Sequence, residues 1–132
     1  MSALEVTRRF VERINAHDPD GLAALLTTDH RFVDSLGGEF GGVQTLRDAW
    51  HQYFRIVPDF QVDVVRAFVD EPEVMLVGTA RGTYTRNGQL EPSNAWSTPA
   101  AWRARIRADL VAEWQIYADN EPIRRCMARA SA

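Results

Sequence analysis

The sequence contains no lysine, because all 15 of its basic residues are arginine. Without lysine the chain has no Schiff-base nucleophile, no attachment point for pyridoxal phosphate and no P-loop cation, so these classes of enzyme are excluded. The formal net charge is −3, and this mild acidity lacks the basic footprint of a protein that binds nucleic acid or an anionic membrane. We therefore expect neither partner.

The sequence also has little cysteine and no long apolar run. Its single cysteine, Cys126, cannot form an internal disulfide, which predicts a cytoplasmic protein. No Cys/His pair has zinc-ligand spacing, so we expect no metal, and we expect no other cofactor. The first ten residues, MSALEVTRRF, carry charge from the fifth residue and do not resemble a signal peptide or anchor. With 132 residues, the chain is expected to form a single domain, residues 1–132, with a core and a small interior pocket.

Apolar residues repeat at helical spacing in three N-terminal segments. Residues 3–16 form an amphipathic pattern, and HDPDG then starts a short second helix, with Asp18 as N-cap and Pro19 in the first turn. A third, aromatic-rich pattern runs from about Val43 to Val57, where Pro58 forbids continuation.

The remaining segments alternate with period two and predict strands. They are a brief strand at residues 30–34 before the glycine-rich turn SLGGEFGG, and long strands at residues 60–69, 74–86, 95–107 and 111–118. A parity flip near Val65 predicts a β-bulge, Asn87-Gly88 predicts a type I′ hairpin, and Asp119 or Asn120 is expected to cap a terminal helix. The expected class is α+β, with helices packed on one concave, mainly antiparallel sheet.

The strand at residues 95–107 makes a specific prediction about its two faces. Trp96, Trp102 and Ile106 share one parity and should be buried, whereas Arg103 and its alternate neighbours Arg105 and Arg107 should be exposed or lie at a subunit contact.

Four segments together resemble a known family. The order of elements, FVDSLGGEFGG before an aromatic helix, WSTPAAWRARI and EWQIYADNEP are similar to the SnoaL-like branch of the nuclear transport factor 2-like superfamily. The resemblance covers nearly the whole chain and implies a cystatin-like α+β roll: a cone-shaped curved sheet wrapped around three helices, enclosing an apolar pocket. It also implies pairing of two copies through the outer sheet face. The superfamily includes polyketide cyclases, ketosteroid isomerases and epoxide hydrolases, as well as members that only bind or dimerise.

The resemblance assigns site residues position by position. Asp34 stands where the isomerases place a carboxylate base, but Phe10 replaces their helix-one tyrosine and Trp102 replaces their strand acid. Epoxide hydrolases of this fold have an aspartate two residues after a tryptophan, where this chain has Ile116 after Trp114. Asp119 lies near the acid/base aspartate of the cyclases and is a second catalytic candidate.

Asp34 has an argument of its own, because it shares strand parity with Phe32 and should point inward. An inward carboxylate can be a general base in an apolar pocket, or it can accept hydrogen bonds from the backbone of the turn that follows. The sequence leaves both interpretations open. The role of Asp119 also stays open between catalysis and structure, because Asp-Asn-Glu-Pro is typical of a helix start.

Aromatic and aliphatic residues on the inward faces could line a ligand pocket or simply form the core. The candidate ligand contacts are Phe10, Ile14, Phe32, Trp50, Phe54, Trp96, Trp102, Trp114 and Ile116. Tyr53 is a candidate catalytic donor, since its hydroxyl could bind a ligand carbonyl in place of the missing helix-one tyrosine.

The sequence therefore favours a small-molecule-binding protein that acts as a cofactor-independent isomerase, cyclase or hydratase-like enzyme. Its substrate would be a small apolar organic molecule, with Asp34 as general base, and the protein would be a homodimer. The alternative is a non-catalytic ligand-binding or dimerisation module of the same fold.

Overall fold

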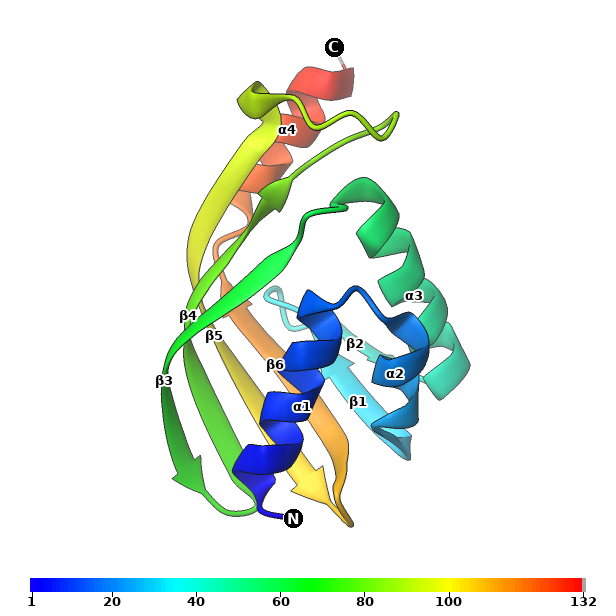
Figure 1. The fold of residues 1–132 in the computed structure, drawn as a ribbon, viewed down its shortest axis with the longest axis vertical. Coiled ribbons are helices and arrows are strands. Elements are labelled where there is room, and N and C mark those ends of the chain that lie inside the picture. Colours follow the sequence, from blue (N-terminus) through cyan, green and yellow to red (C-terminus); the bar gives the residue numbers. More distant parts are fainter. Residues whose placement is uncertain (132) are drawn as a thin grey trace.

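A computed structural model of the protein describes residues 1–131 and shows a curved sheet wrapped around helices (Figure 1). The helices are α1 (Ala3–Asn15), α2 (Pro19–Ala24), α3 (Val43–Ile56) and α4 (Glu121–Ser131), with a short 3-10 turn, η1, at Pro92–Asn94. The strands are β1 (Leu26–Val33), β2 (Glu39–Gly41), β3 (Gln61–Asp70), β4 (Glu73–Thr83), β5 (Ala95–Arg107) and β6 (Leu110–Ala118).

The strands form one six-stranded sheet in the order β2-β1-β6-β5-β4-β3. All neighbours are antiparallel except β1 and β6, which are parallel. Helices α1, α2 and α3 lie on the concave side of the sheet, and α4 lies at one end (Figure 1). The molecule is therefore an α+β cone of the expected class.

The helix boundaries follow from local chemistry. The Ser2 side chain accepts a hydrogen bond from the backbone N–H of Glu5 at 3.1 Å and caps α1. Asp18 caps α2 by accepting from the N–H of Gly21 at 2.9 Å, with Pro19 in the first turn, as predicted. Helix α3 ends at Ile56, one residue before the predicted end and two before Pro58.

The predicted bulge is confirmed, and it brings two strands unusually close. The register of β3 against β4 shifts between Val64 and Arg66. On β4, a Cβ atom added to Gly78 would lie 1.9 Å from the carbonyl oxygen of Asp63, so only glycine fits against β3 at this point. Because bulges bend a strand and increase its twist, this contact lies where the sheet curls over the helices.

The two faces of β5 are as predicted. Trp96, Trp102 and Ile106 are buried, whereas the side chains of Arg105 and Arg107 are about half exposed. Arg103 is only 23% exposed because it forms ion pairs with Glu73 and Glu113 on the neighbouring strands. Partial burial disfavours the Arg103 charge, but its hydrogen bonds to these two carboxylates outweigh that cost and raise the pKa of the guanidinium.

Three local predictions were wrong. The strand expected at residues 74–86 ends at Thr83, and Asn87-Gly88 is part of a longer loop in which the Thr85 hydroxyl accepts hydrogen bonds from the N–H groups of both residues. The glycine-rich segment contains a short edge strand, β2, because residues 39–41 pair with β1. Strand β1 begins at Leu26 rather than at residue 30. In the glycine-rich segment, pairing with β1 overrides a local turn signal, whereas after β4 the local hydrogen bonds of Thr85 replace the expected tight hairpin.

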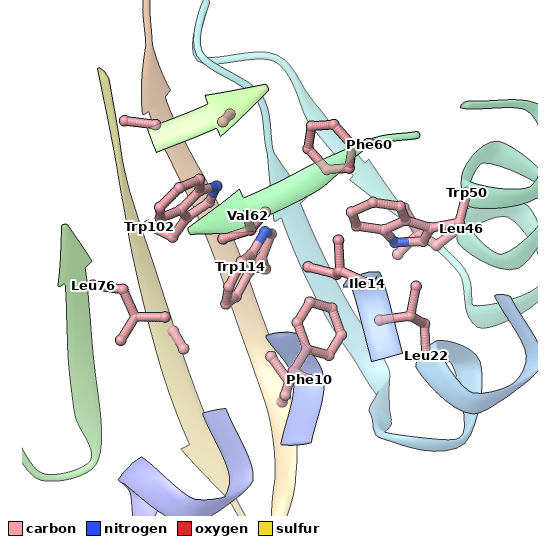
Figure 2. Packing of buried hydrophobic residues seen from close by; sticks show 14 of the residues in the cluster. Phe10, Ile14, Leu22, Leu46, Trp50, Phe60, Val62, Leu76, Trp102 and Trp114 are labelled. Carbon is pink, nitrogen blue, oxygen red and sulfur yellow. The ribbon is translucent and has the colours of Figure 1, made fainter. Parts of the chain in front are cut away.

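The core fills the space between α1 and the concave face of the sheet. Phe10 packs against Trp114 with ring centroids 4.7 Å apart and meets the edge of Trp50 at 6.4 Å. Ile14 and Leu22 close the same cluster from the helix side (Figure 2). None of these five side chains is more than 9% exposed, so the inward-facing residues of the helices and of the sheet form one packed core.

We predict that Gly78→Ala lowers the free energy of unfolding by about 1 to 3 kcal/mol, because the added methyl group forces β3 and β4 apart. Leu90→Ala removes an exposed side chain from the β4–β5 loop and should change stability by no more than about 0.5 kcal/mol. Urea unfolding of both variants tests this, and equal stability of the two would contradict the close contact described here.

Candidate functional site

A cavity of about 360 Å³ lies between α3, the β1–β2 turn and the concave face of β4, β5 and β6. This volume is at the lower end of the range for small-molecule pockets. Its lining is Phe32, Asp34, Ser35, Phe40, Thr45, Leu46, Ala49, Trp50, Tyr53, Phe60, Ala80, Trp96, Thr98, Ala100, Trp102, Ile116, Ala118 and Asn120. Figure 2 shows how Trp50 and Phe60 lie on one side of this region and Trp102 on the other.

The cavity brings together seven of the residues singled out from the sequence. They are Asp34, Tyr53, Phe32, Trp50, Trp96, Trp102 and Ile116. The other expected ligand contacts, Phe10, Ile14, Phe54 and Trp114, belong to the packed core and do not line the cavity. Asp119 does not line it either: its carboxylate accepts from the N–H of Glu121 at 2.9 Å at the start of α4.

Asp34 is the first residue after β1 and is partly buried at the cavity wall. Its Oδ1 accepts hydrogen bonds from the backbone N–H groups of Leu36 at 2.9 Å and Gly38 at 2.8 Å. Its own N–H donates to the carbonyl of Gly38 at 2.9 Å, so the turn and the side chain are fixed together. Among residues 1–131 no donor reaches Oδ2, which leaves that atom as the carboxylate's remaining acceptor.

Tyr53 lines the cavity from α3, with its ring at right angles to Phe60 and centroids 5.1 Å apart. Burial in this apolar wall raises the pKa of the Tyr53 hydroxyl well above its ordinary value of 10.0. The hydroxyl has no hydrogen-bond partner in the described part of the chain. It therefore stays protonated at neutral pH and is available as a donor.

Six polar or aromatic lining residues are not among the sequence-predicted site residues: Ser35, Phe40, Thr45, Phe60, Thr98 and Asn120. Ser35 and Asn120 meet at the cavity, where the Asn120 amide donates to the Ser35 hydroxyl at 2.5 Å and ties the start of α4 to the turn after Asp34. Phe40 was expected in a turn. Phe60 was expected on a strand, and the parity that it shares with Val62 was the available signal for its burial.

The electrostatics of the cavity are simple. Asp34 is its only charged lining residue, and it takes part in none of the ion pairs of residues 1–131. The buried indole N–H of Trp96 has no acceptor among the described residues, so the wall also contains an unpaired donor. No group of His, Cys, Asp and Glu side chains in that part of the chain could hold a metal ion.

The histidines lie outside the cavity. His30 is buried on β1 and hydrogen bonds through Nδ1 to the carbonyl of Val111 at 2.7 Å. Burial lowers the pKa of His30, which favours the neutral ring that this structural contact uses. His17, in the link between α1 and α2, forms a hydrogen bond through Nε2 to the carbonyl oxygen of Phe60 at 2.7 Å.

The curved sheet around three helices, with an apolar cavity under its concave face, defines a cone of the nuclear transport factor 2-like class. The chain belongs to the SnoaL-like family, because the model of the SnoaL-like domain matches residues 7–114. A search of curated proteins finds no match. No helix within residues 1–131 has the length and hydropathy needed to span a membrane.

Solved structures support the fold. The chain is similar to a protein described as a SnoaL-like polyketide cyclase from Shewanella denitrificans, with 12% identity, a TM-score of 0.81 and coverage of 96% of this chain and 97% of that one. It is similar to an LEH-like epoxide hydrolase from Mycobacterium tuberculosis, with 15% identity, a TM-score of 0.77 and coverage of 96% and 90%. A protein with a ketosteroid isomerase-like fold from Catenulispora acidiphila, in complex with trimethylamine, has 17% identity, a TM-score of 0.73 and coverage of 86% and 84%.

We predict that Tyr53→Phe leaves the phenolate absorbance unchanged between about pH 9 and pH 11, because the folded protein keeps this hydroxyl protonated there. Ultraviolet titration of both proteins, with N-acetyltyrosinamide setting the amplitude for one phenol, gives the measurement. A decrease by the amplitude of one phenol in the variant would show that Tyr53 ionises normally.

Proposed function

We propose that this protein binds a small organic substrate in the cavity and acts as a cofactor-independent isomerase, cyclase or hydratase-like enzyme with Asp34 as general base. The observation that carries the proposal is the Asp34 carboxylate itself: the cavity's only charged group, with Oδ1 fixed by two N–H donors and Oδ2 left free. A base whose orientation is fixed in advance spends no free energy on ordering when the substrate binds.

The proposed chemistry is proton transfer at a carbon next to a carbonyl. Asp34 Oδ2 takes the proton, the electron pair moves into the carbonyl oxygen as an enolate, and the same proton is returned to another carbon in an isomerisation. The Tyr53 hydroxyl donates a hydrogen bond to the oxygen that becomes negative. The aromatic walls exclude water and so strengthen that interaction.

The alternative, a non-catalytic ligand-binding module, is favoured by one specific observation. The two hydrogen bonds to Asp34 Oδ1 are also what an aspartate with a purely structural role in the turn would make. Asp119, the second catalytic candidate, is left out of the proposed mechanism because it caps α4.

We predict that Asp34→Asn lowers the rate of proton transfer by about 10²- to 10⁴-fold with little loss of stability, since the amide oxygen can still accept from the turn. The assay follows loss of α-hydrogens from a panel of cyclic unsaturated ketones in D₂O by proton NMR, so that the natural substrate is not needed. Asp48→Asn, an exposed carboxylate on α3, is the matched control and should exchange at the wild-type rate.

The outcome separates the two interpretations of Asp34. If Asp34 has only a structural role, any exchange persists at the wild-type rate in the variant, because the turn hydrogen bonds are then its whole contribution. That result would remove Asp34 from the catalytic residues and leave the ligand-binding module.

We also propose that two copies pair through the outer face of the sheet, and that the protein works in the cytoplasm. Phe68, Val77 and Tyr117 are 48%, 40% and 44% exposed on that face. They surround the ion pairs of Arg103 with Glu73 and Glu113, so the face carries both apolar area and alternating charge.

The proposal of a cytoplasmic protein is supported by Cys126, which is a free, buried thiol, as expected in a reducing compartment.

We predict that Val77→Glu converts a dimer to a monomer, because it places an unpaired charge at the centre of the buried apolar contact. Leu90→Glu, an equally exposed position on the β4–β5 loop, should remain dimeric. Sedimentation velocity at micromolar concentration measures both, and a monomeric wild-type protein would rule out this interface.

A further inference from the structure

The cavity has a net negative character that its apolar composition conceals. Its one charged side chain is the Asp34 carboxylate, and none of the 15 arginines lines it. Several carboxylates of the sheet have guanidinium partners, as Asp63 has Arg81 at 2.7 Å and Glu73 has Arg103 at 2.6 Å. Asp34 has no such partner among residues 1–131, so its charge is compensated only by two backbone dipoles.

The walls of the cavity add to this character, because seven of the lining residues are aromatic. Phe40, Phe32 and Trp50 follow one another on one side, with centroid separations of 6.5 and 6.1 Å. In a second group of lining rings, Phe60 lies between Tyr53 and Trp96, with centroid separations of 5.1 and 6.1 Å. An aromatic face carries partial negative charge and attracts a cation within about 6 Å of its centroid.

The polar groups that remain are neutral. They are the hydroxyls of Ser35, Thr45, Thr98 and Tyr53, the Asn120 amide and the unpaired indole N–H of Trp96. The first turns of α3 and α4 border the cavity through Thr45 and Asn120 and contribute only partial positive charge. None of these groups carries a full positive charge that could compensate the Asp34 carboxylate.

We infer that the ligand of this cavity carries an alkylated ammonium group, held among the aromatic faces with Asp34 as its counter-ion. This inference rests on the proposed function insofar as it places the ligand in the same cavity, and it adds the ligand's charge. A quaternary or tertiary ammonium group suits the site because it presents methyl or methylene groups to the rings and needs few hydrogen-bond acceptors. In a ligand whose carbon bonded to that nitrogen also lies next to a carbonyl, Asp34 can be both the counter-ion of the ammonium group and the base that removes the proton from that carbon.

Three probes of the same shape and different charge test the inference directly. They are choline, the neutral isostere 3,3-dimethylbutan-1-ol and the anion 3,3-dimethylbutanoate, each titrated into the full chain and followed by tryptophan fluorescence and calorimetry. We expect choline to bind at least about tenfold more tightly than the alcohol, with the anion weakest. In Asp34→Asn that preference should fall to about threefold or less, whereas Asp48→Asn should keep it.

The possible failures are distinguishable. If the alcohol binds as tightly as choline, or the anion binds most tightly at the α3 terminus, the inference is overturned while the proposed function stands. If neither these probes nor the cyclic ketones bind, the proposed function fails together with it. The comparison of the three probes uses the wild-type protein, so poor folding of a variant does not affect this result.

Discussion

The inward-facing row of β5 is the feature on which both the core and the cavity depend. At one end of the row Ile106 and Ala104 pack under α1, and at the other end Trp102, Ala100, Thr98 and Trp96 line the cavity. Helices α1 and α3 cover only part of the concave face, so one uninterrupted period-two pattern forms core at one end of β5 and cavity wall at the other. The bulge in β3, with Gly78 opposite, lies where the sheet curls over this row.

The cavity is present because small residues pair with small residues across the strands. Gly78, Ala100 and Ala118 lie side by side on β4, β5 and β6, and the next pair along is Ala80 and Thr98. In the packed region the same positions combine large and small groups, as Val74, Ala104 and Trp114 do. Native packing leaves few voids, so the cavity is the result of two adjacent rows of small side chains in a sheet rimmed by tryptophans.

This arrangement explains how much the sequence could predict. Periodicity and caps were sufficient for the long helices, the bulge and the faces of β5, because each depends on neighbouring residues. Periodicity says only that a side chain points inward, so it could not distinguish Phe10 and Trp114 in the core from Trp50 and Trp102 at the cavity. That distinction depends on which residues pair across strands, and a single sequence does not contain that register.

At the end of β6, two neighbouring residues have different roles that the sequence did not distinguish. Asp119 and Asn120 are adjacent, yet Asp119 caps α4 while Asn120 reaches the cavity and donates to Ser35. Asp119 was the expected site residue because it lies near the acid/base aspartate of the cyclases that this chain resembles. The structure instead gives the amide a place beside the turn that bears Asp34.

Asp34 shows why structural and functional roles need not compete. Its Oδ1 holds the turn closed by accepting from Leu36 and Gly38, and these bonds also fix the plane of the carboxylate. Once that plane is fixed, Oδ2 is a pre-oriented acceptor in a cavity that offers no other charge. A carboxylate with only a structural role would gain nothing from an aromatic cavity beside it, and a free catalytic carboxylate would have to be ordered at each binding event. The turn hydrogen bonds are therefore what makes the remaining oxygen suitable for recognition or proton transfer.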